Sequence, residues 1–363
     1  MIVHLIAAAR PNFMKIAPLY HELKRRPGME PQIVHTGQHY DLNMSDVFFK
    51  DFGLPDPHIH LGVGSGSHAE QTGRVMMAYE KVAMAQPPDL VVVVGDVNST
   101  LAVTLASAKL GIPVAHLEAG LRSFDRTMPE EINRIAVDAL ADFLWTPSPD
   151  GDENLIRKGV ARDKITRVGN IMIDSLEMLR HGFEALDMPQ EYRVAKGEYG
   201  LITLHRPSNV DDPEKLEQLC ESLKRISLKI PLIFPVHPRT RASMARAGLD
   251  KGMASQENIT LTPPLGYMEF MGLVSQSGIL ITDSGGIQEE TTYLGIPCLT
   301  LRENTERPIT ITQGTNELCR VETLEPLVEA VLEGRFKTGS VPELWDGKTA
   351  VRVADCIETV GKA

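Results

Sequence analysis

The sequence predicts an α/β protein built from two doubly wound domains in tandem. The chain has 363 residues, more than one domain usually holds. Short apolar runs alternate with helical stretches along it, and this alternation is typical of a parallel sheet covered by helices on both faces. The alternation restarts after about residue 170, so we expect one domain over residues 1–170 and a second over residues 171–347.

The first half begins with an apolar run over residues 2–9, followed by Arg10-Pro11. Proline is common in the first turn of a helix, so a strand and then a helix are expected here. Residues 90–94, Leu-Val-Val-Val-Val, predict a strand buried on both faces. By the same criteria the expected strands are 2–9, 31–35, 90–94, 113–117 and 143–146, and the expected helices are 12–25, 43–52, 69–85, 99–110, 130–140 and 152–158.

The second half shows the same alternation of strands and helices without repeating the sequence of the first. Its expected strands are 200–204, 232–236, 259–261, 279–282 and 298–301. Its expected helices are 213–229, 240–247, 267–275, 286–294 and 324–332, and a last helix is expected over 349–360.

Composition and charge exclude several classes of protein. The 37 basic and 48 acidic residues give a net charge of −11, which leaves no basic footprint for nucleic acid or an anionic membrane. No apolar run approaches the ~18 residues of a membrane-spanning helix. The four cysteines form no C-x-x-C pair, which argues against a zinc site or a disulfide framework and fits a reducing, cytoplasmic setting.

The stretch over residues 279–290 predicts an anion site. An apolar strand is followed at once by Asp283-Ser-Gly-Gly and then by a helix, so free backbone N–H groups and the positive end of a helix dipole face a phosphate. We expect Ser284 to cap this helix and to donate its hydroxyl to the anion. Glu290, one turn further on, can accept hydrogen bonds from two neighbouring hydroxyls, as on a ribose. An ordinary strand–turn–helix joint is the alternative.

Polar and ionisable residues follow the main predicted strands in both halves. In open parallel sheets ligands bind beyond the carboxyl ends of the strands. If the two edges face each other, these residues line one cleft between the domains. For any one of them a capping or loop role is the alternative. They are Arg10, Gln38, His39, Asp96, Glu118, His205, Arg206, His237 and the turn 283–286.

Three carboxylates are candidates for acid–base chemistry. Asp96 and Glu118 end neighbouring strands, and an Ala-Gly pair after Glu118 lets a substrate come close. Glu130 and Arg134 are spaced i, i+4, which indicates either a surface ion pair or a carboxylate oriented by Arg134. Carboxylates around one pocket raise the pKa of at least one of them, as general acid–base catalysis requires. His205 is a further acid–base candidate or a phosphate donor.

Nine motifs together give the chain a resemblance to a known family over nearly its whole length. It resembles the non-hydrolysing UDP-N-acetylglucosamine 2-epimerases, which have the glycosyltransferase-B architecture of two Rossmann-like domains facing a central cleft. The motifs are A-R-P-N-F-M-K (9–15), T-G-Q-H (36–39), V-G-D-V-N-S-T (94–100), H-L-E-A-G-L-R (116–122), M-P-E-E-I-N-R (128–134), T-L-H-R (203–206), P-V-H-P (235–238), T-D-S-G-G-I-Q-E-E (282–290) and T-E-R-P (305–308).

The resemblance implies an isomerase that interconverts UDP-GlcNAc and UDP-ManNAc for polysaccharide biosynthesis. UDP is expelled from C1 with loss of the C2 proton, which leaves a 2-acetamidoglucal, and UDP then re-adds while a proton reaches the opposite face of C2. No metal or nicotinamide cofactor is implied. Members of the family are usually homodimers, and their C-terminal helix, here about residues 348–363, usually packs back on the first domain.

The resemblance also implies roles for individual residues. The acid–base candidates are Asp96, Glu118 and Glu130, and His205 corresponds to a residue near the diphosphate. We add five substrate contacts from their positions in the motifs, namely Gln38, His39, Arg134, Arg206 and His237. The positions that correspond to UDP contacts are Arg10, Lys15, Ser284, Gly285, Gly286, Glu290 and Arg307.

Several alternatives stay open. Residues 40–42 and 207–209 depart from the Q-H-R-E-M and H-R-R-E-N patterns that border a second, regulatory UDP-sugar site in many bacterial members. The stretches 121–134 and 237–241 also resemble epimerases of UDP-2,3-diacetamido-glucuronate, whereas residues 305–308 resemble the N-acetylglucosamine type. A glycosyltransferase of the same architecture and a non-catalytic UDP-sugar-binding protein are alternatives from other classes.

Overall fold

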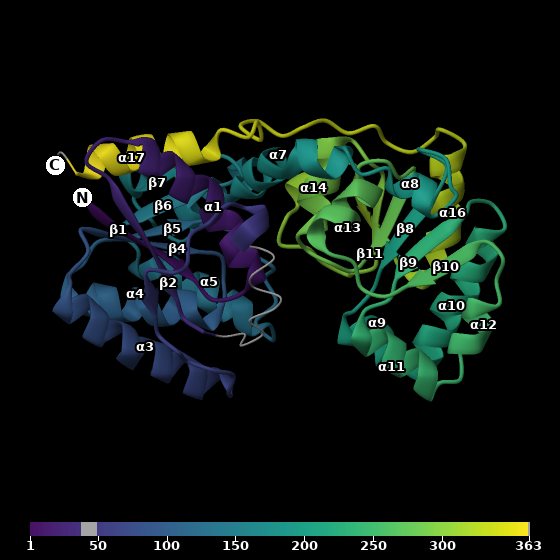
Figure 1. Cartoon of the computed structure of the whole chain (residues 1–363), viewed down its shortest axis with the longest axis horizontal. Coiled ribbons are helices and arrows are strands. Elements are labelled where there is room, and N and C mark those ends of the chain that lie inside the picture. The colour runs from purple at the N-terminus through teal and green to yellow at the C-terminus, as the bar shows by residue number, and fades with distance from the viewer. Residues whose placement is uncertain (38–48, 362–363) are drawn as a thin grey trace. The chain divides into compact units, whose positions relative to one another are not determined.

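The computed structural model describes residues 1–37 and 49–361. The chain divides into two compact units: unit 1 is Met1–Leu179 with Glu343–Ala363, and unit 2 is Arg180–Pro342. Each unit holds one parallel sheet with helices on both of its faces (Figure 1). The predicted α/β class with two doubly wound sheets is therefore confirmed. No helix in the described parts of the chain has both the length and the apolar character needed to cross a membrane.

The sheet of unit 1 has, over the described residues, the strand order β3-β2-β1-β4-β5-β6-β7. Helices α3, α4 and α5 cover one face and α1 and α17 the other (Figure 1). The strands are β1 (Ile2–Ala7), β2 (Glu30–His35), β3 (Ile59–His60), β4 (Leu90–Val94), β5 (Val114–Leu117), β6 (Phe143–Thr146) and β7 (Ile165–Arg167). The helices are α1 (Arg10–Arg25), α3 (His68–Ala85), α4 (Asn98–Leu110), α5 (Pro129–Leu140), α6 (Pro149–Arg157), the short η1 (Arg162–Lys164), α7 (Ile171–Glu184) and α17 (Thr349–Val360).

The sheet of unit 2 has the order β10-β9-β8-β11-β12-β13 over the residues described. Its strands are β8 (Gly200–Thr203), β9 (Leu232–Pro235), β10 (Ile259–Thr262), β11 (Ile279–Thr282), β12 (Cys298–Thr300) and β13 (Asn316–Leu318). The helices are α8 (Met188–Glu191), α9 (Pro207–Val210), α10 (Pro213–Ser227), α11 (Pro238–Arg246), α12 (Asp250–Ala254), α13 (Tyr267–Val274), α14 (Ile287–Leu294), α15 (Ile309–Thr312) and α16 (Val321–Leu332).

The two sheets share a feature that positions the candidate sites. In unit 1 the strand order reverses between β1 and β4, and in unit 2 it reverses between β8 and β11. At such a switch point the loops after the two neighbouring strands diverge to opposite faces and leave room for a ligand. The loops at these points include Gly95-Asp96 after β4, His205 after β8 and Asp283-Ser284 after β11.

The chain returns to unit 1 at its C-terminal end. Helix α17 packs against α1, and its side chains Val353 and Ile357 are fully buried. The carboxylate of Asp174 in α7 accepts the backbone N–H groups of Thr349 (3.1 Å) and Ala350 (2.7 Å), so it satisfies two free donors at the start of α17. Segment 343–361 is therefore part of the packing of unit 1.

Candidate active site

Glu118 is the residue directly after β5, and its backbone is strained. It has φ 70°, a left-handed conformation that residues other than glycine rarely adopt. The side chain is 95% buried, its relative exposure being 5%. Its Oε2 accepts a hydrogen bond from Lys15 Nζ, whereas its Oε1 has no partner within the described residues. One carboxylate oxygen is therefore held and the other is available to a reacting group.

Gly95, between β4 and Asp96, makes room for this pair. A side-chain carbon at this position would lie 3.3 Å from Lys15 Nζ and 3.5 Å from Glu118 Oε2. The residue also has φ 69°, which glycine adopts without strain. The end of β4 is therefore shaped to let the lysine reach the carboxylate.

Asp96 is oriented by Arg134 from helix α5. Arg134 NH2 lies 2.5 Å from Asp96 Oδ2, and its NH1 lies 2.9 Å from Oε2 of Glu131. Glu131 is almost fully buried and also accepts the backbone N–H of Ser123 at 2.9 Å. We did not single out Glu131 from the sequence, although its i, i+3 spacing to Arg134 was visible there.

Glu130 is the neighbour of Glu131 and differs from it in burial, being only half-buried. The spacing predicts an i, i+4 ion pair from Glu130 to Arg134, and in the structure Arg134 pairs with Asp96 and Glu131. Glu130 stays a predicted acid–base residue because it lies in the first turn of α5, next to Glu131.

His205 in unit 2 is held by the carboxylate of Asp283. His205 Nδ1 lies 3.0 Å from Asp283 Oδ1, and Asp283 also accepts the backbone N–H groups of His205 and Arg206. Burial alone would raise the pKa of Asp283, but the contacts with His205, Arg206 and Asn209 outweigh it and lower that pKa. Asp283 is therefore an ionised partner that fixes the imidazole, a role the sequence did not reveal.

His237 lies beside His205, with their ring centroids 5.5 Å apart. Burial and the neighbouring His205 lower the pKa of His237. Arg206 donates from Nε to the backbone oxygen of Asp283 at 2.8 Å. The structure therefore brings together three of the sequence-predicted residues of unit 2, from the ends of β8 and β9, beside Asp283 at the end of β11.

The turn before α14 differs from its prediction in one respect. The helix begins at Ile287 with Gly286 at its N-cap, so the expectation that Ser284 caps it is wrong. The backbone N–H of Ser284 instead bonds Thr282 Oγ1 at 3.0 Å, which places Ser284 in the turn before the helix. Its hydroxyl is therefore not committed to the helix as a cap.

Two arginines approach this turn from the loop after β12. A side-chain carbon on Gly285 would lie 3.4 Å from Arg307 NH1 and 3.5 Å from Arg302 NH1. Arg302 is more than nine-tenths buried, and its NH1 has no partner among the described residues. The sequence identified Arg307 but missed Arg302, and both guanidinium groups pair with Glu306, whose Oε1 would lie 3.1 Å from the same side-chain carbon.

Glu290 is buried in α14 and accepts the hydroxyl of Tyr267 at 2.8 Å. Burial raises the pKa of Glu290 to about 7, although the hydrogen bond from Tyr267 lowers it in part. The group therefore changes charge close to neutral pH, and Tyr267 on α13 holds it in place.

Three of the predicted substrate contacts cannot be placed. Gln38 and His39 lie outside the described residues, and so does the side chain of Arg10, the first residue of α1. Lys15, which was also predicted to contact UDP, lies within the described residues and forms an ion pair with Glu118.

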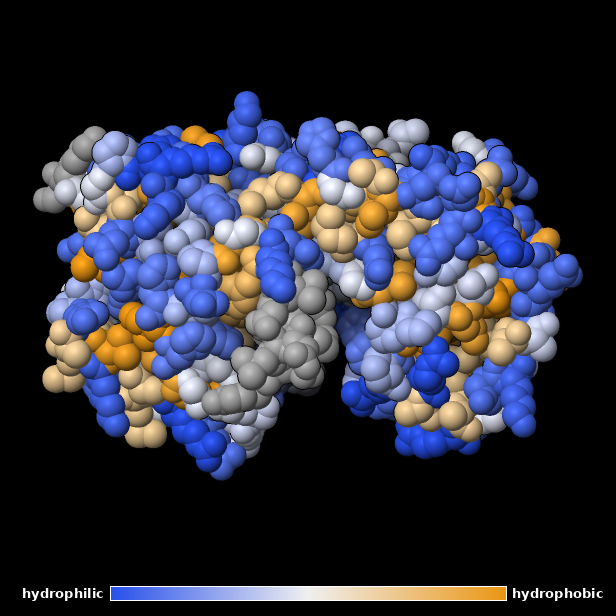
Figure 2. All heavy atoms as spheres, in the orientation of Figure 1, coloured by the Kyte–Doolittle hydropathy of each residue, from blue (hydrophilic) through white to orange (hydrophobic). Residues whose placement is uncertain are grey.

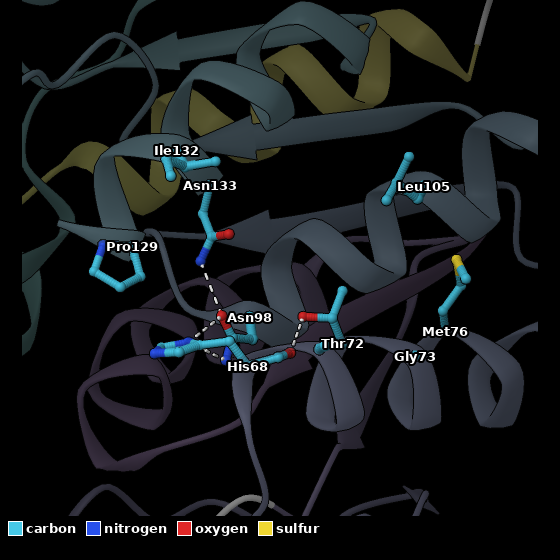
Figure 3. A pocket seen from close by; sticks show the side chains of 10 residues that line it. His68, Thr72, Gly73, Met76, Asn98, Leu105, Pro129, Ile132 and Asn133 are labelled. Carbon is cyan, nitrogen blue, oxygen red and sulfur yellow. Dashed lines mark hydrogen bonds between the residues drawn. The ribbon is translucent and has the colours of Figure 1, made fainter. Parts of the chain in front are cut away.

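A depression of about 440 Å³ lies between α3, α4 and α5 of unit 1. Figure 3 shows Met76 and Leu105 on one side of it, and Asn98 in contact with His68 and Asn133 on the other. None of the sequence-predicted site residues that the structure describes lines it. This depression is therefore separate from the candidate active site.

Comparison with known proteins agrees with the motifs. A family model described as UDP-N-acetylglucosamine 2-epimerase matches residues 21–358. A UDP-N-acetylglucosamine 2-epimerase of Methanococcus maripaludis is 42% identical over 87% of each chain. A UDP-2,3-diacetamido-2,3-dideoxy-D-glucuronate 2-epimerase of Pseudomonas aeruginosa is 40% identical over 88% of each.

A solved structure gives the same result for the fold. The UDP-GlcNAc 2-epimerase of Methanocaldococcus jannaschii, in complex with UDP-GlcNAc and UDP, superposes with a TM-score of 0.87 at 38% identity. The match covers 99% of this chain and 100% of that one. The family expected from the motifs is therefore confirmed, and this chain belongs to the UDP-N-acetylglucosamine 2-epimerase family.

Proposed function

We propose that this chain interconverts UDP-GlcNAc and UDP-ManNAc by elimination and re-addition of UDP. The observation that carries the proposal is the state of Glu118, a buried carboxylate in a strained backbone whose Oε1 has no partner in the described structure. Strain at a single polar residue is typical of functional sites. Membership of the family and the M. jannaschii complex with UDP-GlcNAc support the same substrate.

The proposed elimination takes the C2 proton to a carboxylate of unit 1. The electron pair of the C2–H bond forms the C1=C2 double bond, and the C1–O bond breaks with its electrons going to UDP. Asp96, Glu118 and Glu130 are the proposed acid–base groups. Re-addition reverses these steps with the proton delivered to the opposite face of C2, so carboxylates are needed on both faces.

The proposed UDP site is in unit 2. The hydroxyl of Ser284 and the backbone N–H groups of Gly285 and Gly286, with Arg307, would bind the diphosphate, because such donors and a guanidinium stabilise an anion. His205 would donate to the leaving diphosphate from the ring nitrogen that Asp283 does not hold. Glu290 would accept the ribose hydroxyls, and Arg206 and His237 are further contacts. Arg10, Lys15, Gln38, His39 and Arg134 stay proposed contacts from the sequence.

A second candidate is the same chemistry on UDP-2,3-diacetamido-glucuronate. It is favoured by the P. aeruginosa relative with that name at 40% identity. The two candidates differ in the substituents at C3 and C5 of the sugar and share the chemistry at C1 and C2.

One experiment tests both candidates. The protein is incubated with each nucleotide sugar in deuterium oxide, and the C2 proton is followed by NMR. Exchange and inversion at C2 of UDP-GlcNAc support the first proposal, and reaction of the uronate alone supports the second. Binding of UDP without exchange in either sugar would contradict epimerase activity.

We also propose that the enzyme is a homodimer and that the depression between α3, α4 and α5 lies in its interface. Met77, Met84, Ile132 and Leu140 on α3 and α5 are exposed apolar side chains. Figure 2 shows hydrophobic side chains gathered over α3 and α4. Light scattering should give twice the mass of the 40.0 kDa chain. The variant Ile132→Asp should give the mass of one chain, and a monomeric wild type would contradict the proposal.

We further propose that the protein works in the cytoplasm. The cysteines of the chain are free thiols, three buried and one half-buried. Thiols stay reduced in that compartment. Cell fractionation with an antibody to the protein tests this, and recovery in a membrane or secreted fraction would contradict it.

A further inference from the structure

A buried network of charged groups lies beneath Asp96 and Glu118, and no predicted site residue belongs to it. His116 in β5 is fully buried, with Nδ1 2.6 Å from Asp138 Oδ1 and Nε2 3.0 Å from the backbone oxygen of Gly95. A backbone oxygen can only accept a hydrogen bond, so Nε2 carries a proton. Nδ1 therefore faces the carboxylate of Asp138.

Asp138 on α5 carries the negative charge of this network. Burial by itself would raise the pKa of Asp138, but the charges and hydrogen bonds of His116 and Arg122 outweigh it and lower that pKa. Arg122 NH2 lies 2.6 Å from Asp138 Oδ2. His116, Asp138 and Arg122 therefore form one hydrogen-bonded network around an ionised carboxylate.

Both ends of the network hold backbone groups of the loops that carry Asp96 and Glu118. His116 bonds the oxygen of Gly95, the residue before Asp96. Asp138 Oδ2 accepts the N–H of Gly120, two residues after Glu118, at 3.2 Å. The network therefore connects the end of β4, the end of β5 and helix α5.

The strained backbone of Glu118 needs such support. Its left-handed conformation is strained and persists only where the surroundings determine it. Besides Asp138, one neighbour is fixed by the bond from Ala119 N–H to the oxygen of Trp145, at 3.0 Å. A buried ionic network is not the usual way to stabilise a fold, because apolar side chains of the same volume do so without losing hydration.

We propose that His116 and Asp138 are positioning residues that hold the loops of Asp96 and Glu118 at a fixed geometry for proton transfer, an inference that rests on the proposed epimerase function. They touch the backbone of these loops and leave the reacting groups free. Substitution should therefore slow the chemical step and leave UDP binding, which is assigned to unit 2, unchanged.

The variant Asp138→Asn removes the charge with little change in shape. We expect kcat to fall about 10- to 100-fold, since small displacements of reacting groups have effects of that size. UDP affinity measured by calorimetry should stay within about twofold of wild type. The rate of C2 deuterium exchange should fall in parallel with kcat.

Asp142 provides a matched control. It follows α5 and accepts the N–H of Val114, at 3.0 Å, where β5 begins. Asp142→Asn therefore removes the charge of a similar N–H acceptor at the opposite end of the same strand. It should lower the melting temperature and leave kcat unchanged. Equal kcat values for Asp138→Asn, Asp142→Asn and wild type would overturn the inference.

Two substitutions of His116 keep the test decisive if Asp138→Asn does not fold. The amide nitrogen of glutamine matches Nε2 and that of asparagine matches Nδ1, so His116→Gln retains the bond to Gly95 and His116→Asn loses it. We expect His116→Gln to keep more of the wild-type kcat. Equal losses in both would contradict a role in holding the Asp96 loop. A wild type without C2 exchange would instead contradict the proposed function.

Discussion

Single residues decide the proposed chemistry at the end of β5. Glu118 combines burial, a strained backbone and one oxygen bound to Lys15. We predict that Glu118→Gln keeps UDP affinity and loses turnover by about 10²–10⁴-fold, the usual contribution of one positioned acid–base group. Turnover and UDP affinity are measured on the same preparation. The control is Glu153→Gln, at an exposed glutamate. A Glu118→Gln variant within a few-fold of wild type would show a structural role.

Glu290 gives a prediction about pH. Its pKa is raised to about 7 in the free protein, and the proposed ribose contact needs the ionised carboxylate. UDP affinity should therefore fall as the pH drops through 7, by ~10-fold between pH 8 and pH 6. Calorimetry at several pH values with wild type and Glu290→Gln separates this effect from the titration of UDP itself. An identical pH dependence in both proteins would exclude Glu290 as the cause.

The raised pKa of Glu290 also makes stability depend on pH, in the direction opposite to that of UDP affinity. Between the ordinary pKa of a glutamate, 4.5, and about 7 the folded protein binds a proton that the unfolded chain releases. The contribution of Glu290 to stability is therefore complete at low pH and is lost as the pH rises through 7. The proposed binding of UDP favours the ionised form of Glu290, whereas the folded protein without ligand favours the protonated form.

At the scale of elements, the start of α14 makes Ser284 a specific test of the anion site. The helix uses Gly286 as its N-cap, so the Ser284 hydroxyl is not needed for helix stability. We predict that Ser284→Ala weakens UDP binding by roughly 1–3 kcal/mol, the range for a lost hydrogen bond to a charged group, with no change in melting temperature. A lower melting temperature with unchanged UDP affinity would give Ser284 a structural role instead.

A second prediction at the scale of elements concerns the close contact between the residues after β5 and helix α6. Gly120 has φ 81°, and a side-chain carbon there would lie 2.3 Å from the backbone oxygen of Gly151. Gly111, with φ 71°, has no atom within 4 Å of that position. Both alanine variants are strained, but only Gly120→Ala forces the backbones apart. We expect Gly111→Ala to cost about 1 kcal/mol and Gly120→Ala at least about 2 kcal/mol more in chemical denaturation.

At the scale of the whole molecule, the return of the chain to unit 1 has a measurable effect. Val353 and Ile357 of α17 are fully buried. A chain that ends at Lys348 should lose about 3–6 kcal/mol of the stability of unit 1 from these two side chains alone. Calorimetry should show one transition moved to lower temperature, whereas the transition of unit 2 stays in place. Unchanged unfolding would mean that α17 adds nothing to unit 1.

The sequence by itself determined the α/β class, the central strands and the family. Apolar runs such as Leu90–Val94 form a local pattern, because a strand buried on both faces needs consecutive apolar residues. The motifs identified the family because each motif is a short run of consecutive residues that holds a glycine turn, a strand end or a carboxylate. The short edge strands β3, β7 and β13 were missed, since two or three residues carry no periodic signal.

Only the tertiary structure decided which side chains act together. Glu131, Asp138, Asp283, Tyr267 and Arg302 gain their roles from partners that a folded chain brings close. His116 and Asp138 are 22 positions apart, and His205 and Asp283 lie 78 apart. The strain at Glu118 and the N-cap at Gly286 likewise depend on the backbone of neighbouring elements. Local residue patterns specify the elements, whereas contacts across the sheets set the charge and orientation of each site residue, because those depend on what surrounds it in space.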